Sequence, residues 1–299
     1  MVSVRSKVLV QVIKHAGLLN KVIDADNLEY NRRQLKKLEK YFPVPRWAKV
    51  TTAHSDKFRG EWVSAPNSDK TKILLYLHGG GFVFNATKLY RDLIARLARF
   101  TGLTILSIDY SLAPEHPYPV ALNETLAAYK WLIREGYRAE NIALGGDSAG
   151  GALVLSLLHK LREYKISMPA CAFVMSPATD ATLEKTSIEN SDKDIYINLQ
   201  SLRFFIESYF ANTPTDDSTA SPLLGPLKDF PPLQIHVDKS EIMYNDSVRF
   251  ADKARRAGVP VEIYEADGLF HVWHIFARYI PEAKQSIKDI GRFVKEYTS

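Results

Sequence analysis

Residues 142–158 read IALGGDSAGGALVLSLL and carry the clearest structural signal in the chain. Three apolar residues come first, four glycines then surround Ser148, and a leucine-rich segment follows. Glycine is favoured where the backbone turns through positive φ or closely approaches another group. The pattern therefore predicts a buried strand, a sharp turn with Ser148 exposed at its tip, and a helix directly after the turn.

The residues around Ser148 fit G-x-S-x-G, with Gly146 and Gly150 as its outer glycines. A serine on a strained turn projects its hydroxyl freely only if the residues two before and two after it have no side chains to collide. The following helix would also point its first N–H groups toward developing negative charge. A phosphate-binding loop is excluded because that motif needs lysine where Gly151 stands.

A second glycine-rich loop, HGGGF at residues 78–82, follows the apolar run 73–77. Its three glycines expose backbone N–H groups that can donate to an oxyanion, and such a loop accompanies G-x-S-x-G in lipases and esterases. A dinucleotide-binding fingerprint is excluded, because Phe84 stands where its last glycine would be needed. We expect His78 to orient this loop through a hydrogen bond rather than to act as a base.

A serine nucleophile needs a histidine that takes its proton and a carboxylate that orients the histidine. In α/β sheets with a nucleophile elbow, the chain order is serine, acid, histidine. His271 ends the turn DGLFH at residues 267–271, after the last predicted strand, and is the predicted base. His274 lies three residues later between two large apolar side chains, so we expect it to pack in the core.

The acid should lie in the segment 238–246, which follows the predicted strand 233–237. Asp238, Glu241 and Asp246 all stand there. Chain order alone leaves the choice among these three open.

Short apolar runs alternate with amphipathic helical patterns from residue 72 onward, which predicts an α/β fold with a mainly parallel sheet. The predicted strands are residues 73–77, 103–108, 142–144, 170–175, 233–237 and 261–265. The predicted helices centre on residues 89–100, 122–133, 153–161, 248–254 and 287–294, with two more at about 7–19 and 28–42, the second capped by Asp26. Residues 176–232 contain no clear strand but a short aromatic helix near residues 202–209, and together with the N-terminal helices they predict a lid over the strand ends.

The composition is that of a globular protein, with 46% hydrophobic and 24% charged residues in 299. The single cysteine, Cys171, excludes an internal disulfide framework and multi-cysteine metal clusters. No run approaches the roughly 18 apolar residues of a membrane span, and residues 8–23 do not resemble a signal peptide. These features predict a cytoplasmic location without stable membrane insertion.

The net charge of +5 is unevenly distributed. Residues 1–50 hold 11 Lys and Arg against 4 Asp and Glu, whereas the remainder holds 28 against 30. We interpret the basic N-terminal segment as a solvated helix face, with contact to anionic lipid or nucleic acid as the alternative. No nucleic-acid-binding motif supports that alternative.

The motifs taken together resemble the hormone-sensitive-lipase-like family, the bacterial family IV carboxylesterases of the α/β-hydrolase superfamily. The shared segments are HGGGF at 78–82, DYSLAPEHP at 109–117, GDSAGG at 146–151 and GLFH at 268–271. The resemblance runs from about residue 72 to the C-terminus, and the first 50 or so residues resemble the family's helical cap only loosely. It implies an α/β-hydrolase fold in which residues 1–45 form a cap segment and residues 46–299 the catalytic domain, with a cap insertion at about 177–215.

Carried over by position, the resemblance implies a catalytic triad and an oxyanion hole. The triad would be Ser148, Glu241 and His271, and the N–H groups of the oxyanion hole would come from Gly79, Gly80 and Ala149. Glu241 aligns with the first acidic position of a segment like D-P-L-x-D-E, although aspartate is commoner there. No metal or organic cofactor is implied.

The resemblance implies a small-molecule ester substrate with an acyl chain of about C2–C8. Aromatic residues that predict an apolar pocket are Phe82, Phe84, Phe204, Phe205 and Tyr209. The alternatives are a lactone or amide hydrolase that uses the same triad and, from another class, a non-catalytic receptor for small ligands. No nucleic-acid partner is expected, and a homodimer agrees with the resemblance.

Overall fold

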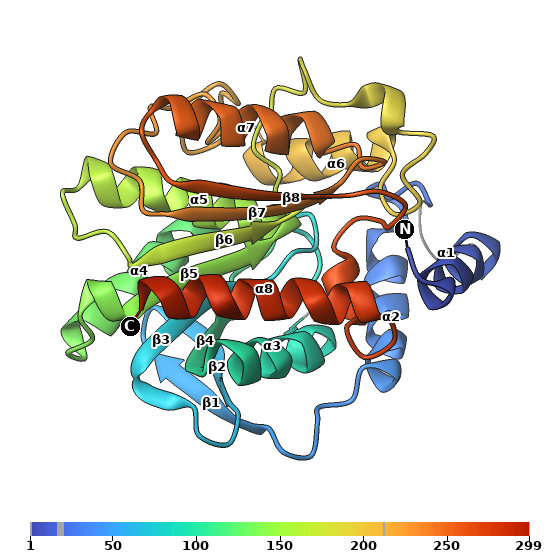
Figure 1. The fold of residues 1–299 in the computed structure, drawn as a ribbon. Coiled ribbons are helices and arrows are strands. Elements are labelled where there is room, and N and C mark those ends of the chain that lie inside the picture. Colours follow the sequence, from blue (N-terminus) through green and yellow to red (C-terminus); the bar gives the residue numbers. More distant parts are fainter. Residues whose placement is uncertain (1, 17–20, 86, 212, 299) are drawn as a thin grey trace.

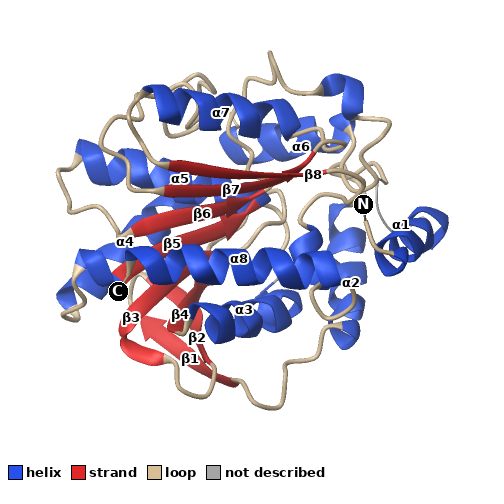
Figure 2. Cartoon of the chain, in the orientation of Figure 1, coloured by secondary structure: helices blue, strands red, loops and turns tan. Residues whose placement is uncertain are grey.

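The computed structural model describes residues 2–16, 21–85, 87–211 and 213–298. These residues form an eight-stranded sheet in the order β1-β2-β4-β3-β5-β6-β7-β8, with helices on both faces (Figures 1 and 2). The strands are β1 (Lys49–Ser55), β2 (Phe58–Ser64), β3 (Asp69–Leu77), β4 (Leu103–Ile108), β5 (Ile142–Asp147), β6 (Cys171–Met175), β7 (Leu233–Asp238) and β8 (Val261–Ala266). The α-helices are α1 (Val4–Ala16), α2 (Leu28–Leu38), α3 (Thr87–Thr101), α4 (Val120–Arg134), α5 (Ser148–Glu163), α6 (Leu199–Phe210), α7 (Tyr244–Arg256) and α8 (Pro281–Tyr297).

All six strands predicted from apolar runs are present and parallel to one another, so the predicted α/β architecture is confirmed. The sequence analysis missed β1 and β2, which form an antiparallel hairpin at one edge of the sheet. Buried, intermediate and exposed residues mix along β2. The hairpin therefore lacks the continuous apolar run that marks a strand buried on both faces.

The two faces of the sheet have separate cores, because successive side chains of a strand point to opposite sides. On β3, Ile73 and Leu75 pack in the cluster that includes α4, α5 and α7. Leu74 and Tyr76 pack in the cluster on the other face, with α3 and α8. Because both of their faces are buried, the strands are held rigidly. The loops that follow their carboxyl ends therefore start from fixed positions.

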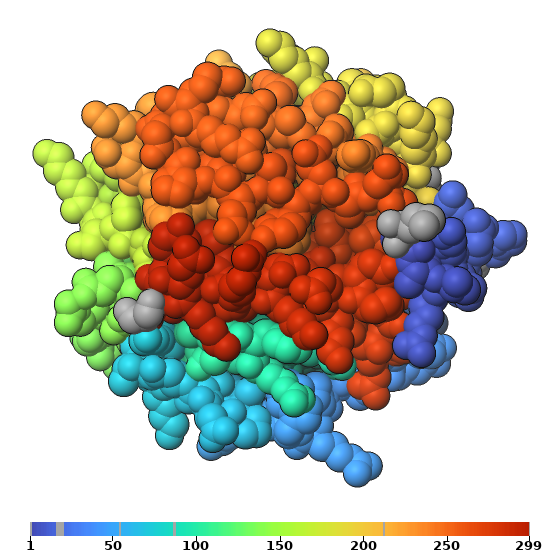
Figure 3. Space-filling model, in the orientation of Figure 1, coloured from blue at the N-terminus to red at the C-terminus, as the bar shows by residue number. Residues whose placement is uncertain are grey.

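The N-terminal segment and α6 lie beside the carboxyl ends of the strands (Figure 1). Two hydrogen bonds join them: the Ile23 N–H donates to Ser201 Oγ (2.9 Å), and the Ser201 hydroxyl donates to the Lys21 carbonyl (3.1 Å). The predicted lid elements therefore meet. On the right of the space-filling view (Figure 3), dark-blue N-terminal residues adjoin red C-terminal ones. The two ends of the chain are joined by a hydrogen bond that Ser6 Oγ donates to Glu282 at 2.6 Å.

The N-terminal helices differ in detail from their predictions. Helix α1 begins earlier than expected, and the last residues of its predicted range, 17–19, lie outside the described part of the chain. Asn27, not Asp26, holds the N-cap position of α2, but its side chain makes no capping hydrogen bond. Asn27 and Asp24 instead exchange hydrogen bonds across the preceding turn. Within the described ranges, no helix combines the length and apolar character needed to span a bilayer.

Arg32 on α2 connects the N-terminal segment to the two loops that follow β3 and β4. Its Nε donates to the Val83 carbonyl at 2.8 Å, and its Nη2 donates to the Ala113 carbonyl at 2.8 Å. Its guanidinium also pairs with Glu115, which lowers the pKa of that carboxyl to about 2. Glu115 therefore fastens the DYSLAPEHP segment to α2.

Candidate active site

The turn between β5 and α5 has the geometry expected of a nucleophile elbow. Strand β5 ends at Asp147, helix α5 begins at Ser148, and Ser148 has a φ of +50°. A Cβ on Gly146 would lie 2.6 Å from the Gly150 carbonyl oxygen, and a Cβ on Gly150 only 2.1 Å from that of Leu77. Side chains at these positions cannot be accommodated, which explains the glycines around Ser148.

The HGGGF loop follows β3 and passes directly beside this elbow. Gly80 and Gly81 have φ of +116° and +59°, and a Cβ on Gly81 would lie 2.6 Å from the Phe205 ring. Gly80, Gly81 and Ser148 line the same cavity. His78 is buried, with Nδ1 2.6 Å from the Gly79 carbonyl and its ring stacked on Tyr110 at 4.3 Å, so it supports the loop as expected.

The Asp147 carboxylate joins the two glycine-rich turns. It accepts hydrogen bonds from Tyr76 (2.7 Å), Tyr90 (2.5 Å) and the Gly79 N–H (3.0 Å), and burial raises its pKa to about 6. The Gly79 N–H is therefore occupied, and Gly79 does not line the cavity. This differs from the expectation that Gly79 donates to an oxyanion: the N–H groups of Gly80 and Gly81 belong to the cavity-lining part of the loop.

Glu241 and His271 are hydrogen-bonded to each other, with Oε2 2.8 Å from Nδ1, and both side chains are buried. Burial lowers the pKa of His271, but the hydrogen bond and charge of Glu241 outweigh it, so the pKa lies above 6.5. The other imidazole nitrogen, Nε2, is buried without a partner among the described residues. His271 lines the same cavity as Ser148.

Ser176 connects the acid and histidine loops, and sequence reasoning missed it. Its hydroxyl donates to Glu241 Oε1 (2.9 Å) and accepts from the Val272 N–H (3.1 Å). The Asp238 N–H also donates to Glu241 Oε1, at 2.7 Å. Because these partners lie far apart in the chain, no local motif could have identified Ser176.

The side chain of Asp238 holds the backbone of the loop that carries His271. Its Oδ2 accepts from the Leu269 N–H at 2.8 Å, and its Oδ1 accepts from Ser240. It is therefore bound to the turn that precedes His271 and not to the imidazole. His274 stacks on Trp273 at 4.2 Å, and burial holds its pKa well below 6.5, in agreement with the packing role predicted for it.

Comparisons with known proteins agree with this geometry. A family described as alpha/beta hydrolase fold matches residues 74–275. An acetyl-hydrolase of Streptomyces hygroscopicus is 34% identical over 85% of this chain and 84% of its own, and an esterase of Acinetobacter venetianus is 33% identical over 88% and 87%. A crystal structure of an esterase from the bacterial hormone-sensitive lipase family superimposes with a TM-score of 0.93 at 30% identity, covering 99% of both chains.

The chain belongs to the hormone-sensitive-lipase-like carboxylesterases. The esterase has a cavity of about 320 Å³ at the carboxyl ends of its strands, where ligands bind in open α/β sheets. Its volume lies at the lower end of the range for small-molecule sites. Apolar side chains of Phe84, Leu89 and Phe205 line part of it.

Two of the five predicted pocket aromatics, Phe84 and Phe205, line the cavity of the esterase. Phe82 and Tyr209 do not, because their rings stack on each other at 3.9 Å and are buried. Phe204 lines a separate outer groove.

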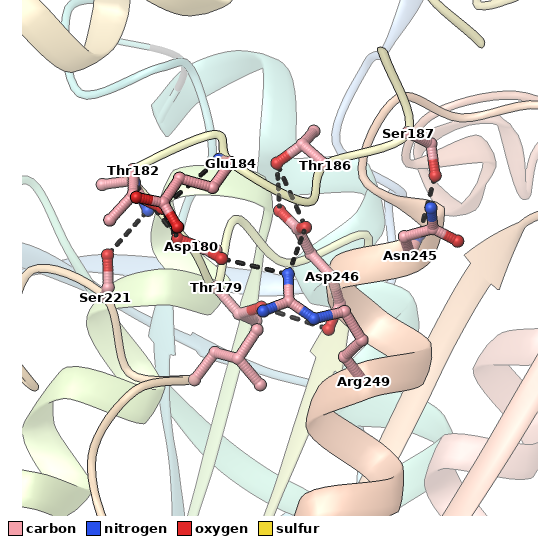
Figure 4. Close-up of polar contacts among 12 residues, drawn as sticks. Thr179, Asp180, Thr182, Glu184, Thr186, Ser187, Ser221, Asn245, Asp246 and Arg249 are labelled. Carbon is pink, nitrogen blue, oxygen red and sulfur yellow. Dashed lines mark hydrogen bonds and ion pairs between the residues drawn. The ribbon is translucent and has the colours of Figure 1, made fainter. Parts of the chain in front are cut away.

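The third candidate acid of the esterase, Asp246, lies in a separate polar cluster (Figure 4). Thr186 Oγ1 lies 3.1 Å from its Oδ1, and Arg249, which pairs with Asp180 at 3.0 Å, lies 3.7 Å from it. Burial and the nearby Asp180 raise the pKa of Asp246 to about 7. The cluster fastens the segment after β6 to α7 and does not include His271.

Asp246→Asn is expected to stabilise the esterase at alkaline pH while leaving ester hydrolysis unchanged. The raised pKa means that ionised Asp246 weakens the folded state, and this loss grows as pH rises from about 4, where the carboxyl ionises in the unfolded chain, to about 7, where it ionises in the folded protein. Thermal unfolding at pH 8 should show a melting temperature about 4 °C higher in the variant. At about pH 4 the difference should vanish, because the carboxyl is then protonated in the folded protein. A loss of hydrolysis would contradict the placement of Asp246 outside the site.

Proposed function

We propose that the carboxylesterase hydrolyses short- to medium-chain esters through an acyl-enzyme formed on Ser148. The observation that carries this proposal is the buried 2.8 Å hydrogen bond between Glu241 and His271, whose Nε2 is unpartnered among the described residues, beside the cavity that Ser148 also lines. Glu241 would hold the proton on Nδ1 and leave Nε2 as the base.

In the first half of the reaction, Nε2 of His271 takes the proton of Ser148 as the serine oxygen attacks the ester carbonyl carbon. The tetrahedral intermediate collapses, the bond to the alcohol oxygen breaks, and His271 returns the proton to that oxygen. Water then attacks the acyl-enzyme with His271 again as base. Collapse of the second intermediate frees the carboxylic acid and restores Ser148.

The oxyanion would be stabilised by the N–H groups of Gly80, Gly81 and Ala149. Ala149 is the second residue of α5, and the first N–H groups of a helix have no partner within it. Gly80 and Gly81 line the cavity, whereas the Gly79 N–H donates to Asp147. The proposal therefore replaces Gly79, expected from the resemblance, with Gly81.

The size and lining of the cavity support acyl chains of about C2–C8. The names of the relatives point the same way, since one is an acetyl-hydrolase. The rate for p-nitrophenyl esters should be highest within that range and fall at least about tenfold by C16. A maximum at C16 would reject the size limit.

A fluorophosphonate probe tests the proposed nucleophile directly, because it phosphonylates an activated serine. Peptide mass spectrometry should locate the adduct on Ser148, and labelling should stop the hydrolysis of p-nitrophenyl butyrate. An unlabelled but active protein, or an adduct elsewhere, would refute the mechanism. Assays with a lactone and an aryl amide compare the alternative substrates of the same site.

A further inference from the structure

The positive charge of the N-terminal segment is not required by the ester-hydrolysis mechanism. Residues 1–50 carry 11 Lys and Arg against 4 Asp and Glu. Part of this segment lines the cavity that Ser148 and His271 also line, and its lining residues include Lys21, Tyr30, Gln34 and Lys37. Helix α2, drawn in blue, lies beside the carboxyl ends of the strands in Figure 1.

Lys21 and Lys37 place two positive charges in the lining of the cavity. Both lysines are exposed, and neither forms an ion pair with a described residue. Asp147 is the only carboxylate among the described residues that line the cavity, and it is buried and held by three donors. The nearby Glu29 is paired with Arg32.

Much of the remaining cavity lining is apolar. Phe84, Leu89, Ile197 and Phe205 belong to it, and they suit the hydrocarbon part of an ester. Gln34, on the same helix as Lys37, adds an amide that can donate a hydrogen bond. A ligand that matches this lining has an apolar body and an anionic end.

We propose that Lys21 and Lys37 make this carboxylesterase selective for esters that carry a carboxylate at the end away from the scissile bond. This inference rests on the proposed function, because it concerns the same cavity. A half-ester of a dicarboxylic acid is the simplest such substrate. The field of the basic segment would also concentrate anionic esters at the mouth, and this effect weakens as salt screens it.

Substrate pairs of equal shape test the proposal. Mono-p-nitrophenyl adipate carries a carboxylate on the acyl side, and its primary-amide counterpart is neutral; 4-acetoxybenzoate and 4-acetoxybenzamide form the pair for the alcohol side. For at least one pair, wild type should show a higher kcat/KM for the carboxylate at about 20 mM salt, and the preference should shrink at about 500 mM. Lys21→Met and Lys37→Met should each lower this preference about threefold to fivefold.

The matched controls are Lys36→Met and Lys40→Met, since both lysines are exposed in the same region and neither lines the cavity. Each control should change the logarithm of the kcat/KM ratio, carboxylate over amide, by less than half as much as Lys21→Met or Lys37→Met does. An equal fall in the controls, or no preference in wild type for either pair, would overturn the assignment. So would retention on anionic phosphatidylserine vesicles that depends on Lys21 and Lys37 while the substrate preference does not.

The results distinguish a failure of the charge selectivity from a failure of the proposed ester-hydrolysis mechanism. Hydrolysis of both neutral amide esters and fluorophosphonate labelling of Ser148 should be the same as in wild type in the two control variants, Lys36→Met and Lys40→Met. If wild type hydrolyses neither member of any pair and resists labelling, the proposed mechanism fails. If it hydrolyses both members of each pair equally well, only the charge selectivity fails.

Discussion

Glu241→Gln is expected to lower kcat about 10⁴-fold with little change in KM. The glutamine amide can present an N–H to His271 Nδ1, which favours the tautomer whose Nε2 carries the proton and cannot act as a base. The 2.8 Å hydrogen bond and the burial of both side chains leave the imidazole no described alternative carboxylate partner. Steady-state kinetics with p-nitrophenyl butyrate measures the effect.

The pH dependence gives this prediction a second readout. Glu241 holds the pKa of His271 above 6.5, and the base works only when neutral. Without the negative charge that pKa falls, so the acidic limb of kcat/KM in Glu241→Gln should move to lower pH. Asp246→Asn is the matched control. Its rate and the acidic limb of its kcat/KM profile should equal those of wild type. A Glu241→Gln enzyme with unchanged rate and pH profile would remove Glu241 from the triad.

Gly150→Ala is expected to prevent correct folding of the nucleophile elbow. The added Cβ would lie 2.1 Å from the Leu77 carbonyl oxygen and 2.5 Å from that of His78. Both atoms belong to the backbone at the end of β3, which is buried on both faces and cannot move aside. We expect an insoluble protein or a melting temperature at least about 10 °C lower, measured by circular dichroism.

Gly151→Ala is the control for this substitution. Its Cβ would lie 3.1 Å from the Pro177 side chain, and no backbone oxygen is as close as at Gly150. The position lies inside α5, where alanine is favoured over glycine by about 1 kcal/mol. The variant should fold with a melting temperature close to that of wild type. Equal destabilisation of both variants would show that the clash at Gly150 is not the cause.

The fold was predictable wherever a strand is buried on both faces. The strand beginning at Ile73 and the one beginning at Leu103 appear in the sequence as apolar runs, since helices cover both sides of the sheet. The edge hairpin around Trp62 was missed because its residues are only partly buried.

A site residue was predictable where the short segment around it also contains the feature that its geometry requires. Ser148 has its glycines beside it, and His271 follows a strand and a turn. The acid could not be chosen this way, because Asp238 and Glu241 differ only in which partner their side chains reach in space. The direction of the Gly79 N–H likewise depends on the distant Asp147. The cytoplasmic location and the homodimer stay predictions.

Arg32 fastens part of the cavity wall to the loops beside Ser148. It holds helix α2, several of whose residues line the cavity, to the Val83 carbonyl just after the HGGGF loop and to the Ala113 carbonyl. A movement of α2 that widened the entrance would have to break these bonds or displace the HGGGF loop. We therefore expect bulky substrates to lose turnover as well as affinity, and a foreign N-terminal segment grafted onto this fold to need its own guanidinium at this place.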